Sequence, residues 1–174
     1  MESGAKDSSA ICAATVSALH ASDNTGKLKE IISIIQKKVG GINVSCRPCS
    51  SEGVEAGARA FLANSVPLTV TLCTNRLKNE TKDIEEALMH ELVHAFDYVH
   101  GRCDFSTCNG LAFTEVRAAK EAECGGMYPI PWFKANCIKS HATKSTANLF
   151  PMKDSIQCVE NVYAVAVKDN APFE

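Results

Sequence analysis

Long apolar runs, an excess of positive charge and a basic leader are all missing from this sequence. No apolar run approaches the roughly 20 residues that a bilayer crossing needs, so any membrane association is expected to be peripheral or through partners. The 18 Lys and Arg are outnumbered by 20 Asp and Glu, and the formal net charge of -2 gives no field that favours nucleic acid. The first seven residues are acidic and short of Arg, unlike a presequence, and we expect residues 1–9 to be disordered.

Repeats, low-complexity segments and a visible domain boundary are also absent. A chain of 174 residues can bury a hydrophobic core, so we expect one domain over residues 10–174. Hydrophobic periodicity predicts several helices outside the segment discussed next, namely residues 10–21, 26–39, 111–124, 133–147 and 153–167. Strands are expected at 42–46, 58–62 and 66–73.

The most informative feature that is present is an HExxH motif, His90-Glu91-Leu92-Val93-His94. Histidines four residues apart on a helix lie on the same face, about one turn apart, so both imidazoles can reach one metal ion. Glu91 lies next to this pair and could take a proton from a water on the metal. The motif therefore indicates a zinc peptidase.

A simpler interpretation is that His90 and His94 are ordinary helix histidines beside a surface Glu91. The surrounding pattern disfavours it, because apolar residues recur at three- and four-residue steps through the motif and predict a long, core-facing helix. Gly101 suits the end of that helix. The apolar residues are Ile84, Leu88, Leu92, Ala95, Phe96 and Val99.

A catalytic zinc usually takes three protein ligands, and two candidates follow the motif. Asp97 lies three residues after His94, but its short side chain would struggle to reach the metal on a straight helix, so it suits a supporting or capping role better. Glu115 is the stronger candidate, since its spacing after His94 is similar to that of thermolysin-type His2Glu enzymes. The alternative is a solvated Glu115 paired with Arg117 or Lys120.

Several segments together resemble one family, the mitochondrial inner-membrane metallopeptidase involved in ATP synthase assembly, also described as a Ku-binding protein. They are Leu72–Asn75, His90–Arg102 (HELVHAFDYVHGR), Thr114–Ala119 and the tail Asp169–Phe173. The resemblance runs from about residue 40 to the C-terminus. By motif match, it implies that His90 and His94 bind the metal and that Glu91 is catalytic.

The resemblance also implies a fold, a location and a substrate. We expect an α+β, zincin-like single domain with a small sheet packed on the HExxH helix and further helices C-terminal to it. We expect a zinc metalloendopeptidase of the mitochondrial intermembrane space, peripheral on the inner membrane, with a protein substrate that is a subunit of ATP synthase. The family also assists assembly of the membrane sector, partly without proteolysis.

Nine cysteines are many for this length, and Cys46-Arg47-Pro48-Cys49 is a single CxxC. A second pair suited to structural zinc is missing, and the CxxC lacks the strand-to-helix setting of a redox site. The family resemblance favours disulfides, against the alternative of a reduced cytosolic protein with buried thiols. Because nine is odd, at least one thiol is left unpaired within the chain.

Other roles remain open from the sequence. His100, Tyr98, Arg117 and His141 are candidate donors to the oxyanion of a peptidase, and strand 66–73 is the first candidate to pair with an extended substrate. The chain could instead be a non-proteolytic assembly chaperone or scaffold. A DNA-repair adaptor in the cytosol or nucleus is suggested only by the Ku-binding description, and no direct contact with nucleic acid is expected.

Overall fold

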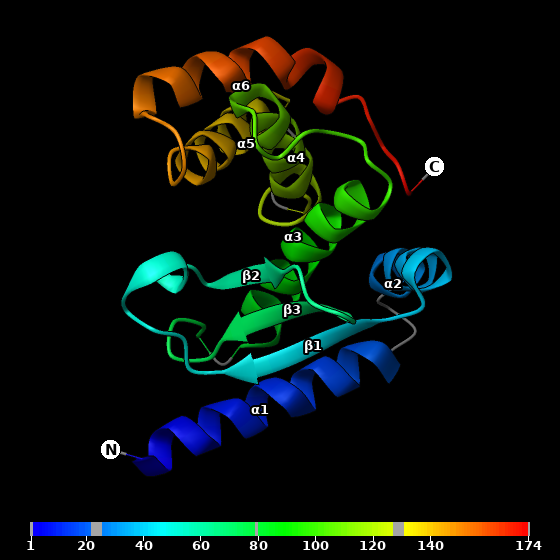
Figure 1. Ribbon diagram of the computed structural model, residues 1–174, viewed down its shortest axis with the longest axis vertical. Coiled ribbons are helices and arrows are strands. Elements are labelled where there is room, and N and C mark those ends of the chain that lie inside the picture. Colours follow the sequence, from blue (N-terminus) through cyan, green and yellow to red (C-terminus); the bar gives the residue numbers. More distant parts are fainter. Residues whose placement is uncertain (1, 22–25, 79, 127–130, 174) are drawn as a thin grey trace. The chain divides into compact units, whose positions relative to one another are not determined.

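The computed structural model describes residues 2–21, 26–78, 80–126 and 131–173. Within these ranges the chain forms six α-helices and three strands, which confirms the predicted mixed α+β class (Figure 1). The chain divides into two compact units, Met1–Ala95 and Phe96–Glu174. None of the described helices has the length and apolar character that a bilayer crossing requires.

The first unit contains a three-stranded sheet in the order β1-β3-β2. Strand β1 (Ile42–Arg47) pairs parallel with β3 (Leu68–Cys73), and β2 (Ala60–Ala63) pairs antiparallel with the other edge of β3. Because both edges of β3 are hydrogen-bonded, the prediction that strand 66–73 pairs with substrate is wrong. Sequence alternation identified the strand but held no information on its position within the sheet.

Two helices precede the sheet and contact β1. Helix α1 (Glu2–Ala21) begins well before the predicted start at residue 10, and a disulfide joins its Cys12 to Cys46 of β1. Helix α2 (Gly26–Val39) matches its predicted bounds, with Leu28, Ile31 and Ile35 buried. Val39 in the last turn is 46% exposed, so the buried face ends before the helix does.

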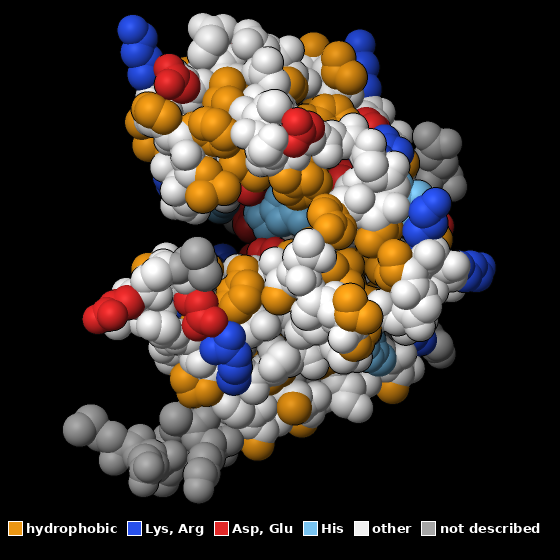
Figure 2. Space-filling view, in the orientation of Figure 1, with side chains coloured by type: hydrophobic (Ala, Val, Ile, Leu, Met, Phe, Trp, Pro, Cys, Tyr) orange, Lys and Arg blue, Asp and Glu red, His pale blue; other side chains and the backbone are white. Residues whose placement is uncertain are grey.

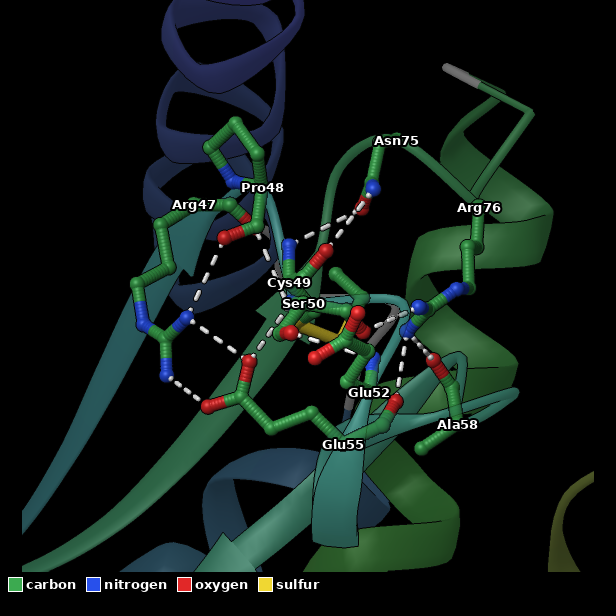
Figure 3. Close-up of polar contacts among 10 residues, drawn as sticks. Arg47, Pro48, Cys49, Ser50, Glu52, Glu55, Ala58, Asn75 and Arg76 are labelled. Carbon is green, nitrogen blue, oxygen red and sulfur yellow. Dashed lines mark hydrogen bonds and ion pairs between the residues drawn. A yellow bond between two sulfur atoms is a disulfide. The ribbon is translucent and has the colours of Figure 1, made fainter.

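Polar contacts hold the loop between β1 and β2 (Figure 3). Arg76 donates hydrogen bonds to three carbonyl groups along the loop, those of Ser50, Glu55 and Ala58. Arg47 binds both carboxylate oxygens of Glu55, and this guanidinium, together with the Ser50 N–H, lowers the pKa of Glu55 to about 2. These contacts and the Cys49–Cys73 disulfide fix the chain that leads into β2.

Helix α3 (Thr81–Val99) carries the HExxH motif and has the predicted apolar stripe. Ile84, Leu88 and Leu92 are completely buried. Gly101 follows the helix with a φ of 59°, a left-handed conformation that glycine adopts without strain, and so ends the helix as predicted. The motif thus lies well inside a long buried helix.

The second unit is formed by α4 (Cys108–Glu121), α5 (Pro131–Thr146) and α6 (Met152–Ala166). These helices lie close to the predicted ranges and contact one another in all three pairs. Their shared core includes Val116 of α4, Ile138 of α5 and Val159 of α6. Disulfides Cys108–Cys158 and Cys124–Cys137 cross-link the unit.

The C-terminal tail after α6 is held by buried charge. Arg117 of α4 is only 2% exposed, and it forms an ion pair with Asp97 at 3.0 Å and with Asp169 of the tail at 2.6 Å. It also donates to the Ala171 carbonyl at 2.6 Å. Lys120, one turn further along α4, donates to the Asp169 carbonyl and Asn170. We call Asp97, Arg117 and Asp169 the tail clamp.

Asp169 makes the stability of the second unit dependent on pH. Burial of its carboxyl opposes ionisation, but the charges of Arg117 and Arg102 outweigh this and hold the pKa of Asp169 below its ordinary value. A carboxyl whose pKa is lower in the folded state stabilises the fold at pH above its unfolded pKa of about 3.9. This contribution is lost as the pH falls through the folded pKa.

We predict that Asp169→Asn lowers the free energy of unfolding by about 2 kcal/mol near pH 7, because Arg117 loses a charged partner. The difference from the wild type should shrink below about pH 4 as Asp169 becomes protonated. Urea denaturation at both pH values measures this. Asp154→Asn, at an exposed position of α6, is the control and should change stability little. An equal loss at both pH values would contradict the assigned charge interaction.

Candidate metal centre

The two motif histidines lie side by side on α3. Their ring centroids are 4.7 Å apart with an interplanar angle of 79°, as expected for positions four residues apart on one helix face. His94 is 8% exposed, and His90 is half-buried. The buried backbone of α3 therefore fixes the separation of the two imidazoles without help from a loop.

Glu91 is also buried, with 8% of its surface exposed. The interpretation of the motif as ordinary histidines beside a surface Glu is therefore wrong in its main premise. Burial of a carboxylate costs free energy unless hydrogen bonds or a charged partner offset it. Water access to this carboxylate is limited, which suits a side chain that transfers protons rather than one that only interacts with solvent.

The donor set fits zinc. Imidazole nitrogen is a favoured zinc ligand, and catalytic zinc sites take three protein ligands and keep one position for water. Helix α3 supplies two nitrogens in a fixed register, so a third ligand from another element would complete such a set. Neutral imidazole binds the metal, so affinity for zinc should fall at acidic pH.

Glu115 lies on α4 in the second unit and is 7% exposed. Its burial contradicts the alternative of a solvated carboxylate. The two cations proposed for that alternative are also engaged elsewhere, since Arg117 pairs with Asp97 and Asp169, and Lys120 lies 3.4 Å from Glu121. Glu115 as the third ligand remains a prediction.

Asp97 is occupied by contacts within the second unit. It is completely buried, and its Oδ2 accepts hydrogen bonds from Thr114 at 2.8 Å and from Arg117 at 3.0 Å. Its Oδ1 lies 3.2 Å from Arg102 Nε. A carboxylate that balances two arginines links the last turn of α3 to α4 within the second unit, which supports the structural role predicted for Asp97 over a ligand role.

The structure rules out one of the four candidate oxyanion donors and leaves the other three. Arg117 is buried and gives its N–H groups to Asp97, Asp169 and Ala171, so its interpretation as a donor to substrate is wrong. His100 has Nδ1 2.9 Å from the Phe96 carbonyl, and Tyr98 is 44% exposed. His141 lies on α5, half-buried. These three remain candidates.

The cysteines form four disulfides within the described residues, and each lies inside one unit. This confirms the prediction of a disulfide-bonded chain with an unpaired thiol, which is Cys103. Burial and the nearby Asp97 charge raise the pKa of Cys103 to about 12, so the thiol is protonated at neutral pH. The two cysteines of the CxxC have separate partners, Cys12 and Cys73.

Sequence reasoning missed the role of Asp169. The tail residues contributed only to the family resemblance, and no local pattern links Asp169 to Arg117, which lies 52 residues earlier. A buried arginine in the middle of an amphipathic helix was the available signal, because such a charge requires an acidic partner somewhere in the fold.

Comparison with known proteins identifies the family. The Peptidase M76 family model matches residues 10–174, the range that the sequence assigns to a single domain. The chain is 27% identical over 169 residues to the mitochondrial inner membrane protease atp23 of Botryotinia fuckeliana, covering 85% of this chain and 69% of that protein. It is 26% identical over 160 residues to the protein of that name in Schizosaccharomyces pombe, covering 84% and 82%.

A human relative, the mitochondrial inner membrane protease ATP23 homolog, is 26% identical over 140 residues, which are 74% of this chain and 54% of that protein. No solved structure gives a significant match. The family match covers nearly the whole chain and includes both the HExxH helix and Glu115. The chain belongs to the Peptidase M76 family and is a metallopeptidase.

Proposed function

We propose that the chain is a zinc-dependent endopeptidase with His90, His94 and Glu115 as metal ligands and Glu91 as the catalytic base. The observation that carries the proposal is the buried HExxH helix within a chain that matches a peptidase family over residues 10–174. The paired imidazoles of α3 support zinc over Mg²⁺ or Ca²⁺, because those harder ions prefer oxygen ligands.

The chemistry follows from the residues of α3. When bound, zinc would supply a Lewis acid that polarises the scissile carbonyl and lowers the pKa of a water to about 7. Glu91 accepts a proton from the attacking water and then donates it to the leaving amine. Its burial among apolar neighbours of α3 keeps bulk water from competing for that proton.

Substrate binding calls for a strand with a free edge. Among the described strands β1 and β2 each pair only with β3, and α1 and α2 contact β1, so the outer edge of β2 is the better candidate to pair with an extended peptide. The contacts of Arg76 with the preceding loop would hold this edge in position. A substrate bound in this way is recognised through its backbone, which suits an endopeptidase.

We further propose that the enzyme works in the mitochondrial intermembrane space, peripherally on the inner membrane, and acts on a subunit of ATP synthase. The names of the relatives support the inner-membrane location, and four disulfides fit an oxidising compartment. The ATP synthase subunit rests on the family resemblance of the sequence. The same resemblance includes help with assembly that does not need proteolysis.

The first prediction separates metal binding from proton transfer. His94→Ala should lose the zinc, whereas Glu91→Gln should keep about one zinc per chain and lower kcat by about 100- to 10,000-fold. Elemental analysis and cleavage of a peptide library, followed by mass spectrometry, measure the two effects. His20→Ala, at an exposed position of α1, is the control and should resemble the wild type. A wild-type chain that binds no zinc under metal-replete conditions would refute the proposal.

The second prediction tests the third ligand. Glu115→Gln should weaken zinc binding by about 100-fold or more, because an amide is a poor replacement for a carboxylate ligand. Competition with a chromophoric chelator measures the affinity. Glu121→Gln, on the same helix and also part-buried, is the matched control and should leave the affinity unchanged. Wild-type affinity in both variants would place the third ligand elsewhere.

A further inference from the structure

Exposed apolar side chains concentrate on one helix pair of the second unit. Among the described residues, most large hydrophobic side chains with substantial exposure lie on α5, α6 and the turn between them, and Figure 2 shows such side chains (orange) at the surface of this region. The residues are Trp132 (65% exposed), Phe133, Leu149 (73%), Met152, Ile156 and Val165. Burial of this apolar surface against a membrane or a protein partner would be favourable.

Contacts between α5 and α6 show that several of these side chains share one face. Lys139 of α5 binds Glu160 of α6 at 2.6 Å and lies 4.7 Å from the Tyr163 ring. Met152 and Ile156 precede Glu160 at four-residue steps, so they lie on the same side of α6, along the seam with α5. Trp132 precedes Lys139 by seven residues, or two turns, and lies toward the other end of this seam.

Helices α5 and α6 carry a net positive charge, although the chain as a whole has a small net negative charge. Residues 131–168 contain five lysines against only Asp154 and Glu160, whereas the whole chain has a formal net charge of -2. Lys144, Lys153 and Lys168 are exposed. A helix pair that combines exposed aromatic and aliphatic side chains with exposed lysines is typical of segments that lie in the interface of an anionic bilayer.

We propose that the α5–α6 face docks on an anionic phospholipid bilayer, with Trp132, Met152 and Ile156 entering the interface and the lysines contacting lipid phosphates. This inference rests on the proposed peripheral membrane location and names the surface responsible for it. Trp132 and Phe133 form an edge-to-face pair at 5.0 Å that would sit at headgroup depth, where amphipathic rings are favoured. The excess of lysine favours an anionic bilayer over a neutral one.

Trp132 is the only tryptophan in the chain, so tryptophan fluorescence reports on this surface alone. A tryptophan that moves from water into the bilayer interface emits at shorter wavelength. The full-length zinc-loaded protein is therefore titrated with vesicles of phosphatidylcholine and phosphatidylserine in equal parts, and with vesicles of phosphatidylcholine alone. We expect a shift of Trp132 emission to shorter wavelength with the mixed vesicles and a much weaker one with the neutral vesicles.

Met152→Ser combined with Ile156→Ser should lower the partition onto the mixed vesicles by about tenfold, because two apolar side chains no longer enter the interface. Val39→Ser, at a 46% exposed position of the first unit, is the matched control and should bind like the wild type. All these positions are exposed, so thermal unfolding should be similar for each variant. Lys144→Glu combined with Lys153→Glu should also weaken binding, and the remaining binding should depend less on salt.

The outcomes separate this inference from the proposed function. Co-flotation of the wild type with mixed vesicles without any change in Trp132 emission would show that another surface binds the membrane. Wild-type partition by the Met152 and Ile156 variant would refute the inference in the same way. If the protein binds neither kind of vesicle, the proposed membrane location is wrong and the α5–α6 face would instead suit a protein partner. Peptide cleavage by each variant is measured separately and tests the proposed function.

Discussion

The geometry of one helix sets the conditions for the whole candidate site. An α-helix turns once in about 3.6 residues, so His90 and His94 must lie on one face with their rings in contact. The separation of the two imidazoles stays constant only if the helix does not fray or bend. Ile84, Leu88 and Leu92 provide that rigidity because each is completely buried. The position of Glu91 between the histidines then follows from the sequence alone.

The end of α3 is stabilised by charge as well as by apolar packing. Asp97 follows His94 by three residues and is held by Thr114, Arg117 and Arg102. Arg117 in turn binds the tail at Asp169 and Ala171. Removing one member would leave a buried charge without its partner, which is far more costly than losing a surface ion pair. The tail, α4 and the end of α3 therefore depend on one another.

Sequence periodicity predicted the helices well because their apolar positions repeat every three or four residues over long segments. The HExxH pair was equally accessible, since both histidines and Glu91 lie within one element. Strand β3 was identified from its alternating residues, yet its central position was not, because pairing with β1 and β2 depends on segments far away in the sequence. The tail clamp was missed for the same reason, as Asp97, Arg117 and Asp169 belong to three separate segments.

The sequence likewise did not predict which cysteines pair with one another. The CxxC at Cys46 and Cys49 suggests a local pair, but the fold sends Cys46 to Cys12 of α1 and Cys49 to Cys73 of β3. Eight cysteines are engaged in disulfides, so among the described residues only the Cys103 thiol would be free to compete with the histidines for a metal ion.

We infer that the histidines of α3 hold a zinc ion in a set of nitrogen and oxygen ligands. X-ray absorption at the zinc edge of the zinc-loaded full-length protein tests this ligand set. We expect a shell of nitrogen and oxygen atoms at about 2.0–2.1 Å, with the multiple-scattering pattern of two imidazoles. A sulfur shell at about 2.3 Å would contradict it, because it would place the metal on cysteine instead of His90 and His94.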